Sequence, residues 1–498
     1  MFDGISVAIS ALLQPDVLAF IIVGSLIGLV AGVLPGLGNV QAMAVALPFT
    51  FGMDRLTAIY FLSAICASAT YGGSVPAILI NVPGTPASAA TTIEGYPMAK
   101  RGEANRALAI SATASLMGGL VGIGVLVVSI PFVRWLALLF GPPETFMLVL
   151  LGLITIAYAI QGNIIRGLAI SGIGILLSLI GYASVTGVYR FSFGSKNYLW
   201  DGIEQVAFLT GVFGLSEAIQ LGMKGRVAGD AEEVALGGFR GTWQGIVDTF
   251  RYPLTFIRSS VVGVIVGIAP GVGGSVSNVV AYAMTAQISK DPLIGKGSVE
   301  GLVACESSNN ATYGGDAIPT LAFGIPGSLA MAILLGGLNL HGVPVGPWVM
   351  REHIEIVWVV VFGLLAGTIV SCVGGLLLAR WLARITLVPT GLLVPAIVVL
   401  ILTGAYAIRQ NFWDLVVAIL SGIFGYFLNR HGFSLLPLII GFLLGAVAEQ
   451  AFIQSLHISE GSLSIFFTHP LSLLLFLGVV ATGVYPVFRR LVAKGVAQ

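Results

Sequence analysis

The sequence predicts an all-α polytopic membrane protein with two inverted-topology repeats, broken helices or re-entrant hairpins, and roughly ten to twelve transmembrane spans. Hydrophobic residues make up 57% of the 498 and charged residues only 9%, whereas soluble domains contain about 25% charged residues. Apolar runs long enough to cross a bilayer, which takes about 20 residues, recur along the chain. Two patterns of proline and glycine occur inside these runs, and each occurs twice.

The duplicated patterns predict where helices break. GVLPGLGN at 32–39 matches GIAPGVGG at 267–274, and YGGSVPAILINVPGTP at 71–86 matches YGGDAIPTLAFGIPGS at 313–328. Since proline and glycine interrupt helices, we expect breaks there whose free backbone groups line a cavity. In YGGSVP and YGGDAIP we expect glycines with positive φ and a proline that opens the next helix.

The internal repeat covers most of the chain. The matched positions are Pro35 with Pro270, Tyr71 with Tyr313, Pro76 with Pro319, and Pro83 with Pro326. We predict a first membrane repeat at 17–222, a cytoplasmic linker at 223–253, a second repeat at 254–456 and an extra C-terminal transmembrane helix at 471–488.

The distribution of basic residues predicts the orientation of the repeats. The basic residues of the linker, its flank and the C-terminal tail are Lys224, Arg226, Arg240, Arg251, Arg258, Arg489, Arg490 and Lys494. Both segments therefore read as cytoplasmic, whereas the loop 455–470 has no Lys or Arg and reads as external. Repeat one then ends inside and repeat two ends outside, so each repeat crosses an odd number of times and the two are inverted.

Several function classes are disfavoured. A net charge of +1 argues against nucleic acid as a partner, because that needs a basic patch. Cys66, Cys305 and Cys372 lie in apolar runs and are interpreted as buried small side chains. An ATP-driven pump would need G-x-x-x-x-G-K-[ST], and a zinc enzyme H-E-x-x-H; neither pattern is found, so we expect no enzymatic activity.

The repeated breaks also predict a substrate site. Half-helix ends near the bilayer midplane hold substrates in transporters built from repeats. The predicted substrate-binding residues are Pro35, Gly36, Gly38, Asn39, Tyr71, Gly72, Gly73, Ser74, Pro83, Gly84, Thr85, Pro86, Pro270, Gly271, Gly273, Pro326, Gly327 and Ser328. Apart from Lys100 and Arg101 at a loop edge, these regions contain no basic residue, so backbone N–H groups and helix dipoles would hold an anion. The alternative is that the glycines serve only helix packing.

A second site is predicted in ESSNNATYGGD at 306–316, the most polar sequence inside an apolar region. Buried charges and amides in a membrane need partners. Neutral oxygens with one carboxylate suit Na⁺, and a carboxylate alone, Asp316 or Glu306, suits H⁺; both ions stay open. The predicted coupling-ion residues, which would form the metal site if the ion is Na⁺, are Ser307, Ser308, Asn309, Asn310, Thr312, Gly314 and Asp316. The alternative is an exposed loop between spans.

PGLGN, YGGSVPAILINVPGTPAS, PGVGG and ESSNNATYGGDAIPTLAFGIPGS resemble the large membrane subunit of the tripartite tricarboxylate transporters, the TctA-type permeases, over essentially the whole chain. The resemblance implies a multi-pass permease of the bacterial inner membrane that imports organic carboxylates by secondary transport, coupled to Na⁺ or H⁺ and without another cofactor. It also implies two partners, a small TctB-type membrane subunit and a periplasmic TctC-type solute-binding protein. The identity of the carboxylate does not follow from it.

Two alternatives stay open from the residues alone. A passive anion channel would share the apolar spans and the broken helices. An intramembrane aspartyl protease would need two facing carboxylates, and Asp316 has only Ser74 as its counterpart in the first repeat.

Overall fold

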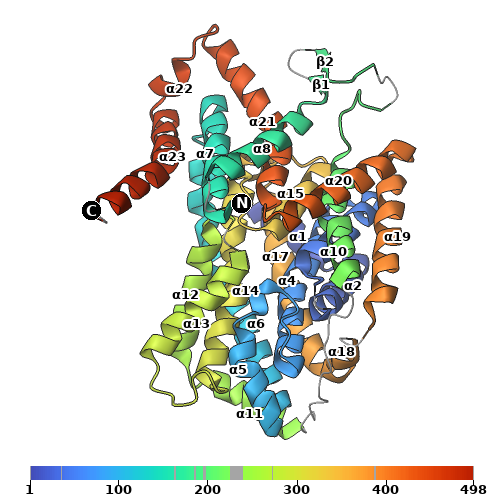
Figure 1. The fold of residues 1–498 in the computed structure, drawn as a ribbon, viewed down its shortest axis with the longest axis vertical. Coiled ribbons are helices and arrows are strands. Elements are labelled where there is room, and N and C mark those ends of the chain that lie inside the picture. Colours follow the sequence, from blue (N-terminus) through green and yellow to red (C-terminus); the bar gives the residue numbers. More distant parts are fainter. Residues whose placement is uncertain are drawn as a thin grey trace.

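The computed structural model describes residues 2–34, 36–161, 164–183, 187–194, 198–224, 239–271, 273–385 and 388–496. These residues are almost all helical (Figure 1), as the all-α prediction requires. The helices of the first half are α1 (Phe2–Leu12), α2 (Pro15–Val33), α3 (Asn39–Ala46), η1 (Leu47–Gly52), α4 (Arg55–Ile80), η2 (Pro86–Ser88), α5 (Thr91–Met98), η3 (Ala99–Glu103), α6 (Ala104–Ala137), α7 (Pro142–Gln161), α8 (Ile164–Ser178), α9 (Gln205–Thr210), η4 (Gly211–Leu215) and α10 (Ser216–Lys224). A two-stranded antiparallel sheet, β1 (Gly181–Ala183) and β2 (Val188–Arg190), lies between α8 and α9.

The second half continues in the same manner. Its helices are α11 (Phe239–Thr249), α12 (Pro253–Ile268), α13 (Gly273–Ile288), α14 (Val299–Phe323), α15 (Leu329–Leu340), α16 (Pro347–Glu352), α17 (Ile354–Leu377), α18 (Ala379–Ile385), α19 (Thr390–Arg409), α20 (Phe412–Arg430), α21 (Leu436–Ile458), α22 (Ile465–Thr468) and α23 (Pro470–Val496).

Two long helices, α4 and α14, form the centre of the molecule and are buried along nearly their whole length. Helix α2 packs on α4, and α12 packs on α14 in the same way. Each central helix also contacts a helix of the other half, since α17 packs on α4 and α6 packs on α14. Similar contacts therefore recur in the two halves, whereas their opposite orientation in the membrane stays a prediction.

Glycines allow these helices to approach closely. A Cβ at Gly28 of α2 would lie 2.5 Å from the Ile65 oxygen of α4, and a Cβ at Gly263 of α12 would lie 2.3 Å from the Ser308 oxygen of α14. At Gly118 of α6 the added Cβ would lie 2.1 Å from a backbone oxygen of α14. Packing through small residues is the usual basis of helix association in a membrane, and it explains these glycines fully.

The helices do not break at YGGSVP and YGGDAIP, and this prediction is wrong. Helix α4 continues through Pro76, and α14 continues through Pro319. The two glycines before each proline are helical rather than positive in φ. Their lack of a side chain serves packing, because a Cβ at Gly72 would lie 2.5 Å from the oxygen of Leu29. Membrane helices tolerate an interior proline when neighbouring groups bind the backbone that it frees.

Both central helices end about one turn after their interior proline, α4 after Pro76 and α14 after Pro319. The C-cap of α4 is Asn81 with φ 58°, and that of α14 is Gly324 with φ 71°, both left-handed. The chain then runs without regular helix through PGTP and IPGS before η2 and α15 begin. The two PG motifs break the chain as predicted, with φ of 87° at Gly36 and 83° at Gly271.

The contacts correct the register of the repeat by one residue. Gly72 faces the Leu29 oxygen and the Gly32 Cα, and Gly315 faces the equivalent atoms of Val264 and Gly267. Counting back from these glycines pairs Tyr71 with Gly314 and Thr70 with Tyr313, so the predicted pairing of Tyr71 with Tyr313 is wrong. Counting forward pairs Asp316 with Gly73 rather than with Ser74.

The predicted bounds of the two repeats and of the linker stay predictions. The range predicted as a linker, 223–253, contains α11, which packs on α6 just as α1 packs on α17. Part of that linker, 225–238, lies outside the described residues, as does Pro35. Within the described part, eight helices are long and apolar enough to cross a membrane, or up to nine with the bent pair α11–α12. The 25 residues of α14 are not among them, because its middle is polar. The ten to twelve spans stay a prediction.

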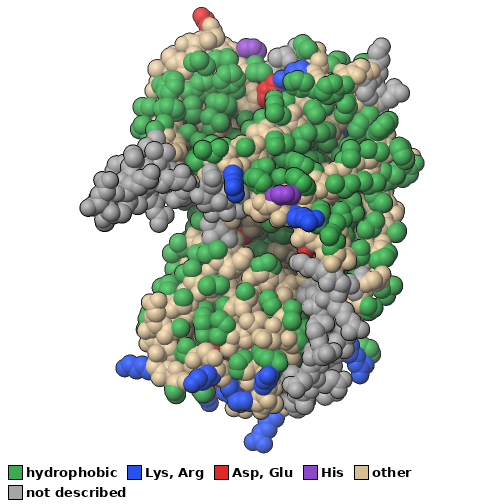
Figure 2. Space-filling model, in the orientation of Figure 1, with side chains coloured by type: hydrophobic (Ala, Val, Ile, Leu, Met, Phe, Trp, Pro, Cys, Tyr) green, Lys and Arg blue, Asp and Glu red, His purple; other side chains and the backbone are tan. Residues whose placement is uncertain are grey.

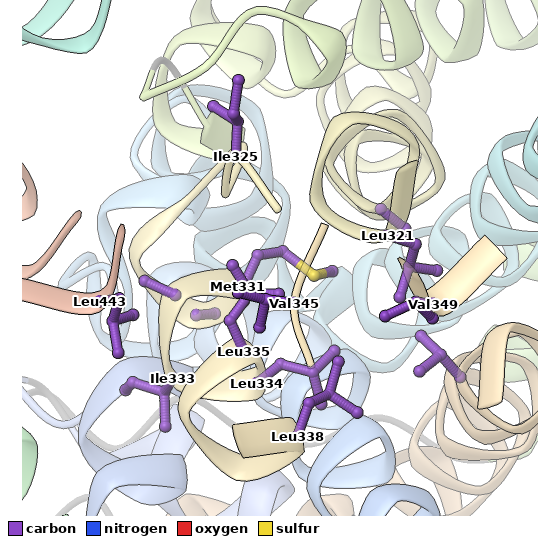
Figure 3. Packing of buried hydrophobic residues seen from close by; sticks show 14 of the residues in the cluster. Leu321, Ile325, Met331, Ile333, Leu334, Leu335, Leu338, Val345, Val349 and Leu443 are labelled. Carbon is purple, nitrogen blue, oxygen red and sulfur yellow. The ribbon is translucent and has the colours of Figure 1, made fainter. Parts of the chain in front are cut away.

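Figure 2 shows hydrophobic side chains over most of the visible face, with Lys and Arg gathered at its lower end. Figure 3 shows the core around α15, where Met331 and Leu334 lie near Val345, and Val349 lies beside Leu321. All five are buried. This packing holds α15 in place, and its N-terminus is one boundary of the cavity described next.

Candidate substrate cavity

A cavity of about 250 Å³ lies where the broken segments of the two halves meet. Its walls are formed by Asn39, Val40, Thr70, Thr85, Pro86, Ala87, Gly271, Gly273, Gly274, Ser275, Asn309, Thr312, Tyr313, Asp316, Ser328, Leu329, Ala330, Ser434 and Leu436. The first half supplies α3, α4 and the segment after α4; the second supplies α13, α14 and the start of α15. Neither half could form this site alone.

Three helices begin at the cavity. Asn39 is the first residue of α3, Gly273 is the first residue of α13, and Ser328 is the N-cap of α15. The first N–H groups of a helix have no partner within it, and the helix dipole is positive at this end. The Ser328 hydroxyl accepts one of them, from Met331 N–H. The cavity therefore combines the features that bind anions at helix N-termini.

One face of α14 forms the opposite wall. Asn309, Thr312, Tyr313 and Asp316 follow one another at intervals of three, one and three residues, which places them on the same side of a helix. Thr312 donates to the Ser308 carbonyl one turn earlier and shares a hydrogen bond of 2.7 Å with Ser277 of α13. The alternative of an exposed loop at 306–316 is wrong, because this whole sequence is buried inside α14.

Polar atoms on this wall lack partners. Both Nδ2 and Oδ1 of Asn309 are buried without a hydrogen bond, and so is Oδ1 of Asp316. Each residue is 1% exposed. An unsatisfied buried polar group costs about 1–3 kcal/mol, and more when it is charged. These atoms are therefore free to bind a ligand that enters the cavity.

Asp316 is the only ionisable carboxylate in the wall, and the described lining contains no Lys, Arg or His. An anionic substrate would meet helix N-termini, hydroxyls and amides, together with one like charge. A cation bound beside Asp316 would neutralise that charge. The aspartyl-protease alternative is not supported here, because the described lining has no second carboxylate to face Asp316.

Hydrogen bonds join the two halves at the cavity. Asn39 Nδ2 donates to the phenol oxygen of Tyr313 at 2.8 Å, and Thr70 Oγ1 is bonded to the same oxygen. Outside the wall, Asn278 Oδ1 accepts from the backbone N–H of Ala90 at 2.8 Å. The segment after α4 is thus held on α13 of the other half.

The cavity contains nine of the predicted site residues, and Tyr313, which belongs to the same motif but was not predicted as a site residue. The nine are Asn39, Thr85, Pro86, Gly271, Gly273 and Ser328 from the substrate set, and Asn309, Thr312 and Asp316 from the coupling-ion set. The described residues that lie elsewhere are Gly36, Gly38, Tyr71, Gly72, Gly73, Ser74, Pro83, Gly84, Pro270, Pro326, Gly327, Ser307, Ser308, Asn310 and Gly314.

The residues outside the wall have other contacts. Ser307 Oγ donates to the Val303 carbonyl of its own helix, and Gly314 packs on the Gly122 backbone of α6. Asn310 is also turned toward α6, where its Cβ is 3.7 Å from the position of an added Cβ at Gly119. Helical periodicity divides the polar sequence between the cavity and the packing surfaces.

The cavity also contains residues that sequence reasoning missed. Gly274 is the last residue of the predicted motif at 267–274 and Ser275 directly follows it, so including the whole motif and one more residue would have found them. Thr70 could be predicted as a site residue only with the corrected register of the repeat, which pairs it with Tyr313. Ser434 and Leu436 come from the loop before α21 and carry no recognisable signal.

Comparison with known proteins matches this chain to one family. The model of the tripartite tricarboxylate transporter TctA family matches residues 18–440. The chain belongs to the TctA family.

Two proteins of Agrobacterium vitis are similar to this TctA-family chain. An uncharacterized 52.8 kDa protein in the TAR-I ttuC' 3' region is 34% identical over 475 residues, which covers 95% of this chain and 93% of that protein. An uncharacterized protein in the TAR-II ttuC' 3' region is 34% identical over 221 residues, which covers 44% of this chain and 91% of that protein. No solved structure matches. The family is one of transporters, and the apolar helices agree with a multi-pass membrane protein.

Proposed function

We propose that this protein is the large permease subunit of a secondary, cation-coupled importer of organic carboxylates, and that the cavity is its substrate site. The observation that carries the proposal is the convergence of three helix N-termini from both halves on one cavity whose described lining contains no basic side chain. This arrangement suits a carboxylate, whose oxygens accept from backbone N–H groups.

The coupling cation binds, in this proposal, at the wall formed by α14. Asn309 Oδ1 and Asp316 Oδ1 are buried oxygens without partners, and oxygen ligands of this kind suit a hard cation. Na⁺ bound there would neutralise Asp316 and remove the negative charge that would otherwise repel the substrate. Binding of the cation and binding of the anion would then favour each other, which is the basis of coupled transport.

The partners belong to the same proposal. A periplasmic TctC-type protein would deliver the carboxylate, and a small TctB-type subunit would accompany this chain in the bacterial inner membrane. The C-terminus would be cytoplasmic. Family membership supports these partners, because TctA proteins are components of tripartite transporters.

Uptake into proteoliposomes tests the proposal. The complete complex would be supplied with radiolabelled citrate or succinate under separate Na⁺ and pH gradients. A coupled carrier accumulates the carboxylate above its outside concentration when a cation gradient is imposed. A passive channel only equilibrates it, and that result would overturn the proposal.

Asn309→Leu and Asn310→Leu form a matched pair for the cation site. Both amides are buried on α14 without partners, but only Asn309 is in the cavity wall. Asn309→Leu is expected to raise the half-saturating Na⁺ concentration at least tenfold, which corresponds to about 1.4 kcal/mol. Asn310→Leu should leave it within about twofold. Equal effects of the two variants would contradict the assignment of the site.

A further inference from the structure

A second buried carboxylate, Glu306, lies outside the cavity on the side of α14 that faces α4, α5 and α6. Its side chain is fully buried and accepts from three hydroxyls. The donors are Ser74 Oγ at 3.0 Å, Thr91 Oγ1 at 2.6 Å and Ser115 Oγ at 2.8 Å. No ion pair with Lys, Arg or His is found for it among the described residues. A buried charge without a counter-ion is costly in a membrane and usually marks a function.

Other titratable groups surround Glu306 without neutralising it. Tyr71 on α4, Cys305 on α14 and Cys372 on α17 are near enough to interact electrostatically with its carboxylate. On α5 the facing group is Glu94, itself an acid, which interacts with Cys305. Of the groups on the packed elements, Arg106 of α6 is bound to Asp248 and Glu103. Tyr282 of α13 donates its hydroxyl proton to Glu94.

The partners of Glu306 can accept a proton as well as donate one, because a hydroxyl has both a proton and lone pairs. Glu94 is different. It is also fully buried, but it accepts from the backbone N–H groups of Gly295, Gly297 and Ser298 at 2.7 Å each. A backbone N–H can only donate, so each of these three hydrogen bonds needs a lone pair of the Glu94 carboxyl group. The environment of Glu306 can accommodate either protonation state.

A chain of hydroxyls leads from Glu306 to the substrate cavity. Ser74 Oγ is 3.3 Å from Ser88 Oγ, and Ser88 Oγ is 3.2 Å from Thr85 Oγ1. Thr85 is in the cavity wall. Because Ser74 uses its one proton for Glu306, it must accept from Ser88, and Ser88 must in turn accept from Thr85. All the hydroxyls then donate in one direction, from the cavity toward the carboxylate.

We propose that Glu306 is a proton-binding site connected to the substrate cavity by the hydroxyls of Thr85, Ser88 and Ser74. A proton from water or from a protonated carboxylic acid in the cavity binds to Thr85 Oγ1, whose own proton passes to Ser88. The proton of Ser88 passes to Ser74, and that of Ser74 to Glu306. Each hydroxyl keeps one proton, and the net result is a neutral Glu306 and a cavity that has lost one proton.

The path of hydroxyls connects two separate parts of the structure. Thr85 and Ser88 belong to the segment between α4 and α5, whereas Ser74 and Glu306 belong to the two central helices. A displacement of that segment would break the contact between Ser88 and Ser74, which at 3.3 Å is the longest hydrogen bond of the path. Proton access to Glu306 is therefore linked to the position of a cavity wall. As a step of transport this inference rests on the proposed function, but proton binding by Glu306 can be tested without a substrate.

Infrared difference spectroscopy of the full-length protein in lipid nanodiscs tests the site. A step from alkaline to acidic pH should produce the carbonyl band of a protonated carboxylic acid, and Glu306→Gln should remove an intensity equal to one carboxyl group. Identical spectra of the wild type and Glu306→Gln would overturn the proposal. A band that Na⁺ suppresses at every pH would also overturn it, because the carboxylate would then hold the metal ion.

Ser88→Ala tests the path independently, and remains informative if Glu306→Gln does not fold. It should leave the final band unchanged but slow its appearance after a pH jump at least tenfold. Ser371→Ala is the matched control, because that hydroxyl is also buried, donates to the Thr368 carbonyl of its own helix and is not part of the path of hydroxyls. Equal rates in the two variants would remove the path. Absence of citrate and succinate uptake by the wild type would count against the transport function and leave these spectra unaffected.

Discussion

Asn39 Nδ2 donates to the phenol oxygen of Tyr313 at 2.8 Å, so the first residue of α3 in one half is tied to α14 of the other half at the cavity wall. The same phenol oxygen is bonded to Thr70 of α4. One hydroxyl therefore connects three helices that together form most of one side of the cavity. The position of the α3 N-terminus depends on this contact.

Tyr313→Phe should weaken substrate binding without unfolding the protein. The ring is retained, but the Asn39 amide loses its acceptor, which costs about 1–3 kcal/mol when the group is buried. We expect the half-saturating concentration of the carboxylate to rise about tenfold. Uptake titrations of the complex measure it. Tyr426→Phe is the control, since Tyr426 is paired with Met223 outside the wall, and a similar rise in that variant would contradict a role specific to the cavity.

Gly84→Ala should reduce stability, whatever the substrate. Gly84 is not in the cavity wall, and a Cβ added there would lie 2.0 Å from the Gly32 oxygen of α2. Neither backbone can move freely, and overpacking of this kind costs about 1–3 kcal/mol. A lowered thermal midpoint in a fluorescence assay of the purified protein is the expected result.

The control for Gly84→Ala is Gly172→Ala in α8, where no atom lies within 4 Å of the added Cβ. Its thermal midpoint should be unchanged or slightly higher, because alanine favours a helix more than glycine does. Should Gly84→Ala keep the wild-type midpoint and lose only uptake, the glycine would belong to the substrate site after all.

Some of the site could be predicted from the sequence, and the reasons for the rest are physical. The breaks at Gly36 and Gly271 were predictable, because a Pro-Gly pair with a left-handed glycine ends a helix. The passage of α4 through Pro76 was not, because it depends on tertiary contacts. The N–H of Gly84, which lies four residues beyond the end of α4, donates to the carbonyl of Gly73 within α4 at 3.0 Å. No local pattern records such a contact.

The polar sequence in α14 also has one feature that the sequence could predict and one that depends on tertiary contacts. Had 306–316 been treated as a helix, the spacing of Asn309, Thr312 and Asp316 would have placed these three residues on one face. The environment of Glu306 could not have been inferred in that way, since its donors come from α4, α5 and α6. Sequence periodicity shows which residues share a face, but not what that face meets.

Glu94→Gln should loosen the loop between α13 and α14. Glu94 accepts three backbone N–H groups of that loop and the Tyr282 hydroxyl. Glutamine would turn an NH₂ group toward some of these donors, and each lost bond to a charged group costs about 1.5–3 kcal/mol. The exposed Lys290 and Lys296 make the loop a trypsin substrate once it opens.

Limited trypsin digestion of the reconstituted protein measures this effect, with cleavage expected at least tenfold faster than in the wild type. Glu352→Gln provides the control, because Glu352 is exposed at the end of α16. Cleavage at wild-type rates in Glu94→Gln would show that the loop is held by other contacts.

Cysteine labelling tests the inverted topology. Ala231→Cys lies in the predicted cytoplasmic linker, outside the described residues, and Ser462→Cys lies in the exposed loop between α21 and α22. The three native cysteines are buried, so background labelling by a membrane-impermeant maleimide should be low. In intact spheroplasts we expect Ser462→Cys to react and Ala231→Cys to react only after the membrane is opened, as the basic residues of the linker require. Labelling of both from one side would give the two halves parallel rather than opposite orientations, and the cavity would then need a different account of how it opens to each side of the membrane.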